Sequence, residues 1–208
     1  MKKNQKENFI LEIGIATLKL IFVSVLIGFL HQYDFWIMMF LTAFMILKFY
    51  PKFIKNFKEN IILFYGMICT GIFGIAIEYW GVSNGYWSYH DLNDGRDFPF
   101  WLFFSWMLAF YFLYKLECML IGLMKSKSIP VKFFLTISIS MTFPVLGEII
   151  TINLGVWTYY FPLQFLGVPL YAVLGLITVH MIVNFILVFI CKKYHIRDPI
   201  FSLNYLDA

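Results

Sequence analysis

The sequence predicts an all-α fold, a polytopic membrane helical bundle with about six transmembrane helices. Hydrophobic residues make up 61% of the 208 residues and charged residues only 13%, about half the charged fraction of an ordinary soluble domain. Apolar runs of roughly 20 residues, the length that crosses a hydrocarbon core of about 30 Å, recur along the chain. Basic residues separate alternate runs. These observations indicate one integral membrane domain that covers residues 1–208.

The apolar runs define the expected helices in order. The first carries only two charged residues, Glu12 and Lys19, and is too long for a cleaved signal peptide. The second ends at a lysine cluster, the third and fifth lead into similar aromatic loops, and the fourth and sixth begin at Pro99 and Pro169. The expected spans are about 9–30, 33–50, 60–80, 99–121, 133–154 and 169–191.

Basic residues mark the side of the membrane on which each loop lies. Besides the N-terminal segment, they occupy 51–59, 122–132 and the tail after residue 191. The expected loops on the other side are 31–32, 81–98 and 155–168. These loops contain one basic residue, Arg96, which predicts a cell-membrane protein with cytoplasmic N- and C-termini. Because the placement of the basic clusters fits topology signals of a membrane protein, no nucleic-acid partner is expected.

A sequence block recurs at an interval of 70 residues. The stretch "EYWGVSNGYWSYHD" at 78–91 is followed by "EIITINLGVWTYYF" at 148–161. The matching positions are Phe73/Phe143, Glu78/Glu148, Gly85/Gly155, Trp87/Trp157, Tyr89/Tyr159 and Pro99/Pro169. Both copies run from a helix through a loop to a returning helix, so we expect two parallel repeats, at about 60–121 and 133–191. Such pseudo-symmetry commonly places a site between the repeats.

Glu78 and Glu148 are the first candidates for chemistry. A carboxyl group in an apolar membrane segment must be paired, hydrated or protonated. Both glutamates lie toward helix C-termini, where the helix dipole and the apolar surroundings disfavour the ionised form. A neutral acid in this position can donate a proton to an alkene. The alternative is structural: each glutamate binds a Trp or Tyr of its own loop and fixes the hairpin.

The aromatic residues of the two loops are candidates for a substrate pocket. Trp87 and Tyr89 alternate, as do Trp157 and Tyr159, so each pair can face one side of an extended segment. Their ring faces can stabilise a carbocation by cation–π attraction. Gly85 and Gly155 suit left-handed turns, whereas Pro99 and Pro169 suit the first turn of a returning helix. A plain interfacial cap is the alternative role of the same residues.

Four other polar positions remain open from the sequence. His90 and Asp91 end the first copy without counterparts in the second, and they are either a second acid or base or a polar loop. His180 and Asn184 lie four residues apart on the sixth helix, as a substrate-binding pair or as a hydrogen bond between helices. Lys19 requires a partner or a wet cavity. Two further charged residues, Lys115 and Glu117, are expected to snorkel toward the inner face.

Several chemistries lack their motifs. The sequence contains no Cys-x-x-Cys, no histidine cluster for two iron ions and no glycine-rich phosphate loop, so neither a metal nor another cofactor is expected. The three cysteines fall within spans or at their inner ends, so no disulfide is predicted.

The first block has the pattern Glu-x2-Gly-x3-Gly-x-Trp-x-Tyr, and its returning helix contains Trp106. Together with the second block, which ends in Gly-Val-Pro-Leu at 167–170, it resembles the carotenoid-biosynthesis integral-membrane superfamily of bisanhydrobacterioruberin-type hydratases and small lycopene cyclases. The resemblance implies a helical bundle that protonates a terminal double bond of an isoprenoid and then adds water or closes a ring, without a cofactor. It implies Glu78 and Glu148 as the acid and base. Phe100 and Trp101 stand where the cyclases have two glutamates, which counts against a cyclase.

Two other functions are compatible with the residues. The first is a non-enzymatic transporter, lipid-binding or assembly protein, with a water-accessible path through Lys19, His180 and Asn184. The second is an enzyme that acts on another membrane lipid and binds its head group or a metal. The loop residues that would do this are His90, Asp91, Asp94 and Asp97. The oligomeric state is left open by the sequence.

Overall fold

The computed structural model describes residues 3–55, 57–92, 95–124, 128–196 and 200. These residues are mostly helical, which confirms the all-α prediction. The helices are α1 (Lys3–Leu30), α2 (Asp34–Lys55), α3 (Phe57–Ser83), α4 (Leu102–Leu123), α5 (Ile129–Asn153) and α6 (Leu170–Tyr194), with the short 3-10 helix η1 (His31–Tyr33) after α1. The strands are β1 (Trp87–Tyr89), β2 (Trp157–Tyr159), β3 (Gln164–Phe165) and β4 (Val168–Pro169).

Five segments of the described chain are long and apolar enough to cross a membrane. They are Glu7–Pro51, Asn60–Ser83, Leu102–Leu123, Ile129–Asn153 and Leu170–Tyr194. The first is 45 residues long and includes α1 from Glu7 onward, η1 and most of α2. Large apolar side chains such as Leu47 and Phe189 are exposed on these segments, whereas Glu117 and Lys132 are buried. An apolar exterior around buried polar groups indicates a protein embedded in a membrane.

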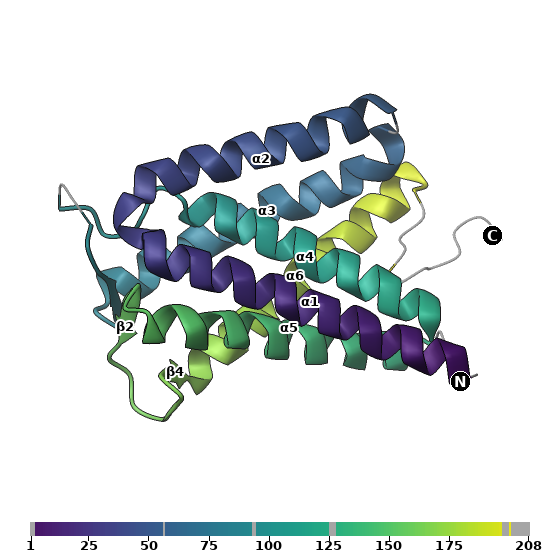
Figure 1. Cartoon of the computed structure of the whole chain (residues 1–208). Helices are drawn as coiled ribbons and strands as arrows, with labels where there is room; N and C mark the ends of the chain where they lie inside the picture. The colour runs from purple at the N-terminus through teal and green to yellow at the C-terminus, as the bar shows by residue number, and fades with distance from the viewer. Residues whose placement is uncertain (1–2, 56, 93–94, 125–127, 197–199, 201–208) are drawn as a thin grey trace.

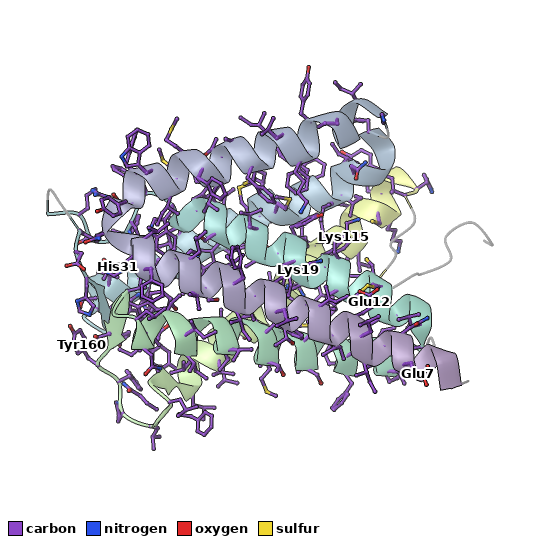
Figure 2. The ribbon with its side chains drawn as sticks, viewed as in Figure 1. Glu7, Glu12, Lys19, His31, Lys115 and Tyr160 are labelled. Carbon is purple, nitrogen blue, oxygen red and sulfur yellow. The ribbon has the colours of Figure 1, made fainter. Side chains whose placement is uncertain are left out.

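The helices lie side by side, and the chain reverses direction between α1 and α2 (Figure 1). α1 packs against α5, and α3 packs against both α4 and α6. The strands gather at one end of the bundle, opposite the N-terminal end of α1 (Figure 1). Figure 2 places His31 and Tyr160 at the strand end and Glu7 at the other end, with Lys19 between them. The strand end therefore collects the loops that the sequence placed on one side.

Glycines let α4 lie close against α3. A Cβ atom at Gly66 would lie 2.2 Å from the Phe110 ring, and one at Gly71 would lie 2.6 Å from the Phe103 ring. Small residues permit this close approach in membranes, where helices associate through van der Waals packing. The same face of α3 continues toward Glu78 and sets the geometry of the site.

The returning helices begin later than the prolines suggested. α4 begins at Leu102, whose N–H donates to the carbonyl of Pro99 at 3.2 Å, so Pro99 precedes the helix and does not form its first turn. The Phe100 N–H is directed to the Asp34 carboxylate at 3.4 Å, which holds this segment in a turn. Pro169 is the N-cap residue of α6.

Candidate active site

The helices that carry the two glutamates end in the same backbone motif. After α3, the Tyr86 N–H donates to the Gly81 carbonyl at 2.9 Å, and the Gly85 N–H donates to the Val82 carbonyl at 2.9 Å. The corresponding bonds after α5, from Val156 and Gly155, measure 3.1 and 3.0 Å. Gly85 and Gly155 have φ values of +68° and +79°. This is the Schellman C-cap, which requires a left-handed residue and favours glycine there, as the sequence predicted.

The segments after these caps pair with each other. β1 and β2 are antiparallel, with Trp87 opposite Tyr159 and Tyr89 opposite Trp157. The flanking bonds are reciprocal as well, because the N–H of His90 donates to the Val156 carbonyl and the N–H of Tyr160 donates to the Tyr86 carbonyl. His90 and Tyr160 are 70 residues apart, as are Tyr86 and Val156, so the two bonds join equivalent positions of the two copies. This two-stranded ribbon thus joins the ends of α3 and α5.

The inner face of the ribbon meets Glu78, which is buried. The Trp87 Nε1–H and the Tyr89 hydroxyl both donate to Glu78 Oε2 at 2.9 Å. Trp106 on α4 donates its Nε1–H to Glu78 Oε1 at 3.2 Å. An indole nitrogen can donate a hydrogen bond but cannot accept one. Each carboxyl oxygen of Glu78 therefore acts as an acceptor toward one indole N–H. The arrangement suits a carboxylate, which accepts hydrogen bonds at both oxygens.

Two glycines on α3 explain how the indoles reach Glu78. A Cβ atom at Gly81 would lie 1.7 Å from the Trp87 ring, and one at Gly74 would lie 2.3 Å from the Trp106 ring. Gly74, Glu78 and Gly81 are spaced by four and three residues, so they share one face of the helix. Each indole therefore lies directly on the α3 backbone with its N–H beside the carboxyl group.

Glu148 has a different environment. Among the residues that the structure describes, its hydrogen-bond donor is Tyr159, whose hydroxyl lies 3.1 Å from Oε2. Thr151 occupies the position that corresponds to Gly81, so an indole cannot lie on α5 as Trp87 lies on α3. Trp157 instead packs beside Tyr89, with ring centroids 5.6 Å apart. The two glutamates occupy matching positions but carry different numbers of donors.

The two ribbon tyrosines, Tyr89 and Tyr159, interact electrostatically with both glutamates. We call these four residues and the aromatic rings that contact them the carboxyl cluster. Burial raises the pKa of Tyr89 well above its ordinary value of 10.0, and the charges of Glu78 and Glu148 raise it further. The pKa of Tyr159 is raised in the same way by burial and by both glutamates. Both phenols therefore remain neutral hydrogen-bond donors at physiological pH. Each tyrosine interacts with the carboxyl group of its own copy and with that of the other.

Tyr171 belongs to the cluster but was not predicted from the sequence. Its ring stacks on Trp87 with a centroid separation of 6.4 Å and meets Tyr159 edge-on at 6.5 Å. Its hydroxyl is buried and has no hydrogen-bond partner among the described residues. The residue 70 positions earlier is Trp101, whose buried Nε1 likewise has no partner there. Comparing the residues two places after each proline would have pointed to this pair.

His90 and Asp91 lie away from the two glutamates. His90 Nε2 lies 2.8 Å from Thr158 Oγ1, and the hydroxyls of Ser88 and Tyr160 are 2.5 Å apart. These four residues form the outward face of the ribbon, in matching positions, so His90 has a counterpart in Tyr160 after all. Asp91 is exposed and lies 2.9 Å from Nε2 of His31. The structure does not bring either residue to the carboxyl cluster.

The remaining loop residues and Lys19 are also separate from the cluster. Arg96 donates to the buried Asp34 carboxylate at 2.6 Å, which ties this loop to α2. Asp97 is exposed, and Asp94 lies outside the described residues. Lys19 is exposed on α1.

His180 and Asn184 belong to a second polar cluster. Nε2 of His180 lies 2.7 Å from Glu117 Oε1 and 3.1 Å from Nδ2 of Asn184, and all three side chains are buried. The expectation that Glu117 snorkels to the inner face was wrong, because this hydrogen bond holds it between α4 and α6. The spacing of His180 and Asn184 predicted their shared face, but the residue on α4 could not be identified from it. Lys115 is exposed, as snorkelling requires.

The described residues contain no group of three or more His, Cys, Asp or Glu side chains arranged to hold a metal ion. Comparison of the chain with protein-family models, curated proteins and solved structures found no match. The site consists of two carboxyl groups that accept different numbers of hydrogen bonds and lie beside aromatic rings.

Proposed function

We propose that the chain is a cofactor-independent membrane enzyme of isoprenoid or carotenoid metabolism, which hydrates or cyclises a terminal alkene by acid–base chemistry. The observation that carries this proposal is the meeting of Glu78 and Glu148 beneath one aromatic ribbon. Two carboxyl groups in unequal environments are the usual means by which one site supplies both an acid and a base. The rings around them suit an apolar substrate and a cationic intermediate.

We assign the acid and the base from the different numbers of hydrogen bonds that the two glutamates accept. Glu78 receives three donated hydrogen bonds, two of them from indoles, and so acts as the carboxylate base. Glu148 receives one bond from the described residues and acts as the neutral acid. Proximity of the two carboxyl groups favours this division, because like charges close together do not both ionise readily.

The reaction begins with Glu148. Its proton adds to the less substituted carbon of the terminal double bond, the π electrons form the new C–H bond, and the more substituted carbon becomes cationic. The faces of Trp87, Tyr159 and Tyr171 stabilise that charge. In a hydratase, a water oxygen attacks the cation while Glu78 takes a water proton. In a cyclase, a second double bond attacks and Glu78 removes a proton from carbon; in both cases the proton then returns from Glu78 to Glu148.

The membrane arrangement forms part of the proposal. We infer six spans, because α1 and α2 run in opposite directions within the 45-residue apolar segment. The reciprocal bonds of the β1–β2 ribbon support two parallel repeats related by a local two-fold axis. From the positions of the basic residues we infer that both termini lie in the cytoplasm and the ribbon on the opposite side.

A direct experiment compares lipids from a host that makes acyclic carotenoids, with and without the expressed protein. A product heavier by one water identifies a hydratase, and an isomer of equal mass identifies a cyclase. An unchanged pigment profile, with the protein shown to be folded in the membrane, rules out the carotenoid substrate.

The buried Glu117–His180–Asn184 cluster favours a second candidate, a non-enzymatic transporter, lipid-binding or assembly protein. A path that also includes Lys19 is not supported, because Lys19 is exposed on α1 while His180 and Asn184 are buried. An enzyme on another lipid, with Asp97 binding the head group, predicts loss of function in Asp97→Ala and retention in Glu148→Gln. The acid–base proposal predicts the reverse.

A further inference from the structure

The loops that follow β1 and β2 differ in how they are held. The first loop is charged and is fixed to the corner between α1 and α2. Asp91 lies 2.9 Å from His31 in η1, and Arg96 donates to Asp34 at the start of α2 at 2.6 Å. Arg96 also stacks over the Phe100 ring, 3.9 Å from its centroid. This loop is therefore covered by protein on its inner side and polar toward solvent.

The second loop, which we call the 160–169 hairpin, has the opposite character. No Asp, Glu, Lys, Arg or His occurs anywhere in the sequence from residue 149 to residue 179. Leu163, Phe165 and Leu166 are 82%, 72% and 60% exposed. Leu163 and Leu166 also have left-handed backbone conformations, with φ of +62° and +51°. Bulky residues rarely adopt such turns, which normally favour glycine or asparagine in water.

Several polar groups of the hairpin hydrogen-bond within their own segment of the chain. β3 and β4 pair with each other, and the Leu170 N–H donates to the Leu163 carbonyl at 3.3 Å. The one polar side chain near the tip, Gln164, donates to the carbonyls of Tyr159 and Phe161 at 2.9 and 2.7 Å. Hydrogen bonds within the segment and apolar side chains on its surface are what hydrocarbon surroundings require.

The exposed surface of the hairpin continues onto a membrane helix. Leu170 and Leu174, in the first turns of α6, are also exposed. They belong to the segment Leu170–Tyr194, which is long and apolar enough to cross the membrane. Figure 1 shows the hairpin at the strand end of the bundle, beside the start of α6. Exposed apolar side chains contiguous with a membrane-facing helix fit lipid acyl chains better than they fit water.

We propose that the 160–169 hairpin inserts into the bilayer and forms the lipid-side wall of the carboxyl cluster. Phe161 on its inner side meets Tyr171 with a centroid separation of 4.4 Å and Tyr86 at 5.4 Å. These rings adjoin Trp87 and Tyr159. On the proposed function, an apolar substrate therefore reaches Glu148 sideways from the acyl chains, past the hairpin and not past the charged first loop.

Thiol labelling in unsealed membrane fragments tests insertion without any activity assay. Phe165→Cys reports on the hairpin, Asp97→Cys is the matched position in the charged loop, and the parent protein measures background from its own cysteines. A charged maleimide should react about tenfold more slowly with Phe165→Cys than with Asp97→Cys, because thiolate formation requires water. After denaturation in detergent the two should react alike. Equal rates in intact membranes would overturn the proposal.

A second measurement separates the hairpin from the proposed function. The double variant Leu163→Ser/Phe165→Ser should raise KM for the apolar substrate several-fold with little change in kcat, since neither residue contacts the carboxyl groups. Unchanged KM would remove the access role even if the hairpin is inserted. If the parent shows no turnover at all, the proposed function fails, and the labelling result still decides insertion.

Discussion

At the scale of single residues, the absence of a side chain at Gly81 allows Trp87 to reach Glu78. The indole lies where a Cβ atom would be 1.7 Å away. Thr151 at the matching position of the second copy prevents the same contact at Glu148. One residue difference thus helps to make two repeated glutamates chemically unequal. The repeat itself was visible in the sequence, but this inequality was not, because it depends on which ring lies over which backbone.

Gly81→Ala tests this contact. The added methyl group must displace the Trp87 ring, so we expect a loss of about 1–3 kcal/mol in stability from overpacking, together with reduced turnover. Gly175→Ala on α6 is the matched control, because a Cβ atom there meets nothing within 4 Å. Thermal unfolding in nanodiscs measures both variants. Equal stability of the two would show that the Trp87 contact has little consequence.

The raised pKa values of Tyr89 and Tyr159 predict a dependence on alkaline pH. The folded protein holds these two protons more tightly than the unfolded chain does. Their contribution to the free energy of unfolding is therefore complete below about pH 10, the pKa of tyrosine in the unfolded chain. It decreases as the pH rises toward the pKa values of the folded protein. We expect the Tyr89→Phe/Tyr159→Phe variant to lose less stability than the parent between about pH 9 and 11. If the stability of the parent and of the variant decreases equally with pH, the pKa values of Tyr89 and Tyr159 are not raised.

At the scale of elements, the caps and the ribbon follow from local sequence, whereas contacts between elements do not. The glycines predicted left-handed turns, and the alternating aromatics predicted extended segments; both expectations are confirmed. The pairing of β1 with β2 is a long-range contact that no local pattern specifies. It determines that His90 faces outward beside Thr158 while Tyr89 faces Glu78. Strand alternation then separates these neighbours onto opposite faces.

The link between α4 and α6 gives a prediction at this scale. His180→Leu removes a hydrogen-bond partner of the buried Glu117 Oε1, so we expect a loss of about 1–3 kcal/mol in stability. His180→Gln keeps a hydrogen-bonding group in the same place and should restore part of that loss. Unfolding of both variants in nanodiscs measures the effect. If the leucine and glutamine variants are equally stable, the hydrogen bond to Glu117 does not hold these helices together.

At the scale of the whole molecule, hydrophobicity alone predicted the helical membrane bundle and the approximate position of each helix. The helix ends were less predictable, because α2 and α6 continue into lysine-containing segments and α4 begins only after the turn held by Asp34. Glu117 illustrates the same limit. Its distance from the inner helix end suggested snorkelling, but its partner on α6 is 63 residues away in the chain. On the proposed function, residues from both copies form one acid–base site.

Solvent isotope incorporation tests whether the two glutamates act together as acid and base. In heavy water, the parent protein should place one deuterium on the carbon that Glu148 protonates, because Glu148 exchanges its proton with solvent between turnovers. Glu148→Gln and Glu78→Gln should each lower the rate of product formation by about 10²- to 10⁴-fold, the usual contribution of a general acid or base. Glu12→Gln, distant on α1, should retain the parent rate. Full turnover with deuterium incorporation in both glutamine variants of the cluster would contradict the account.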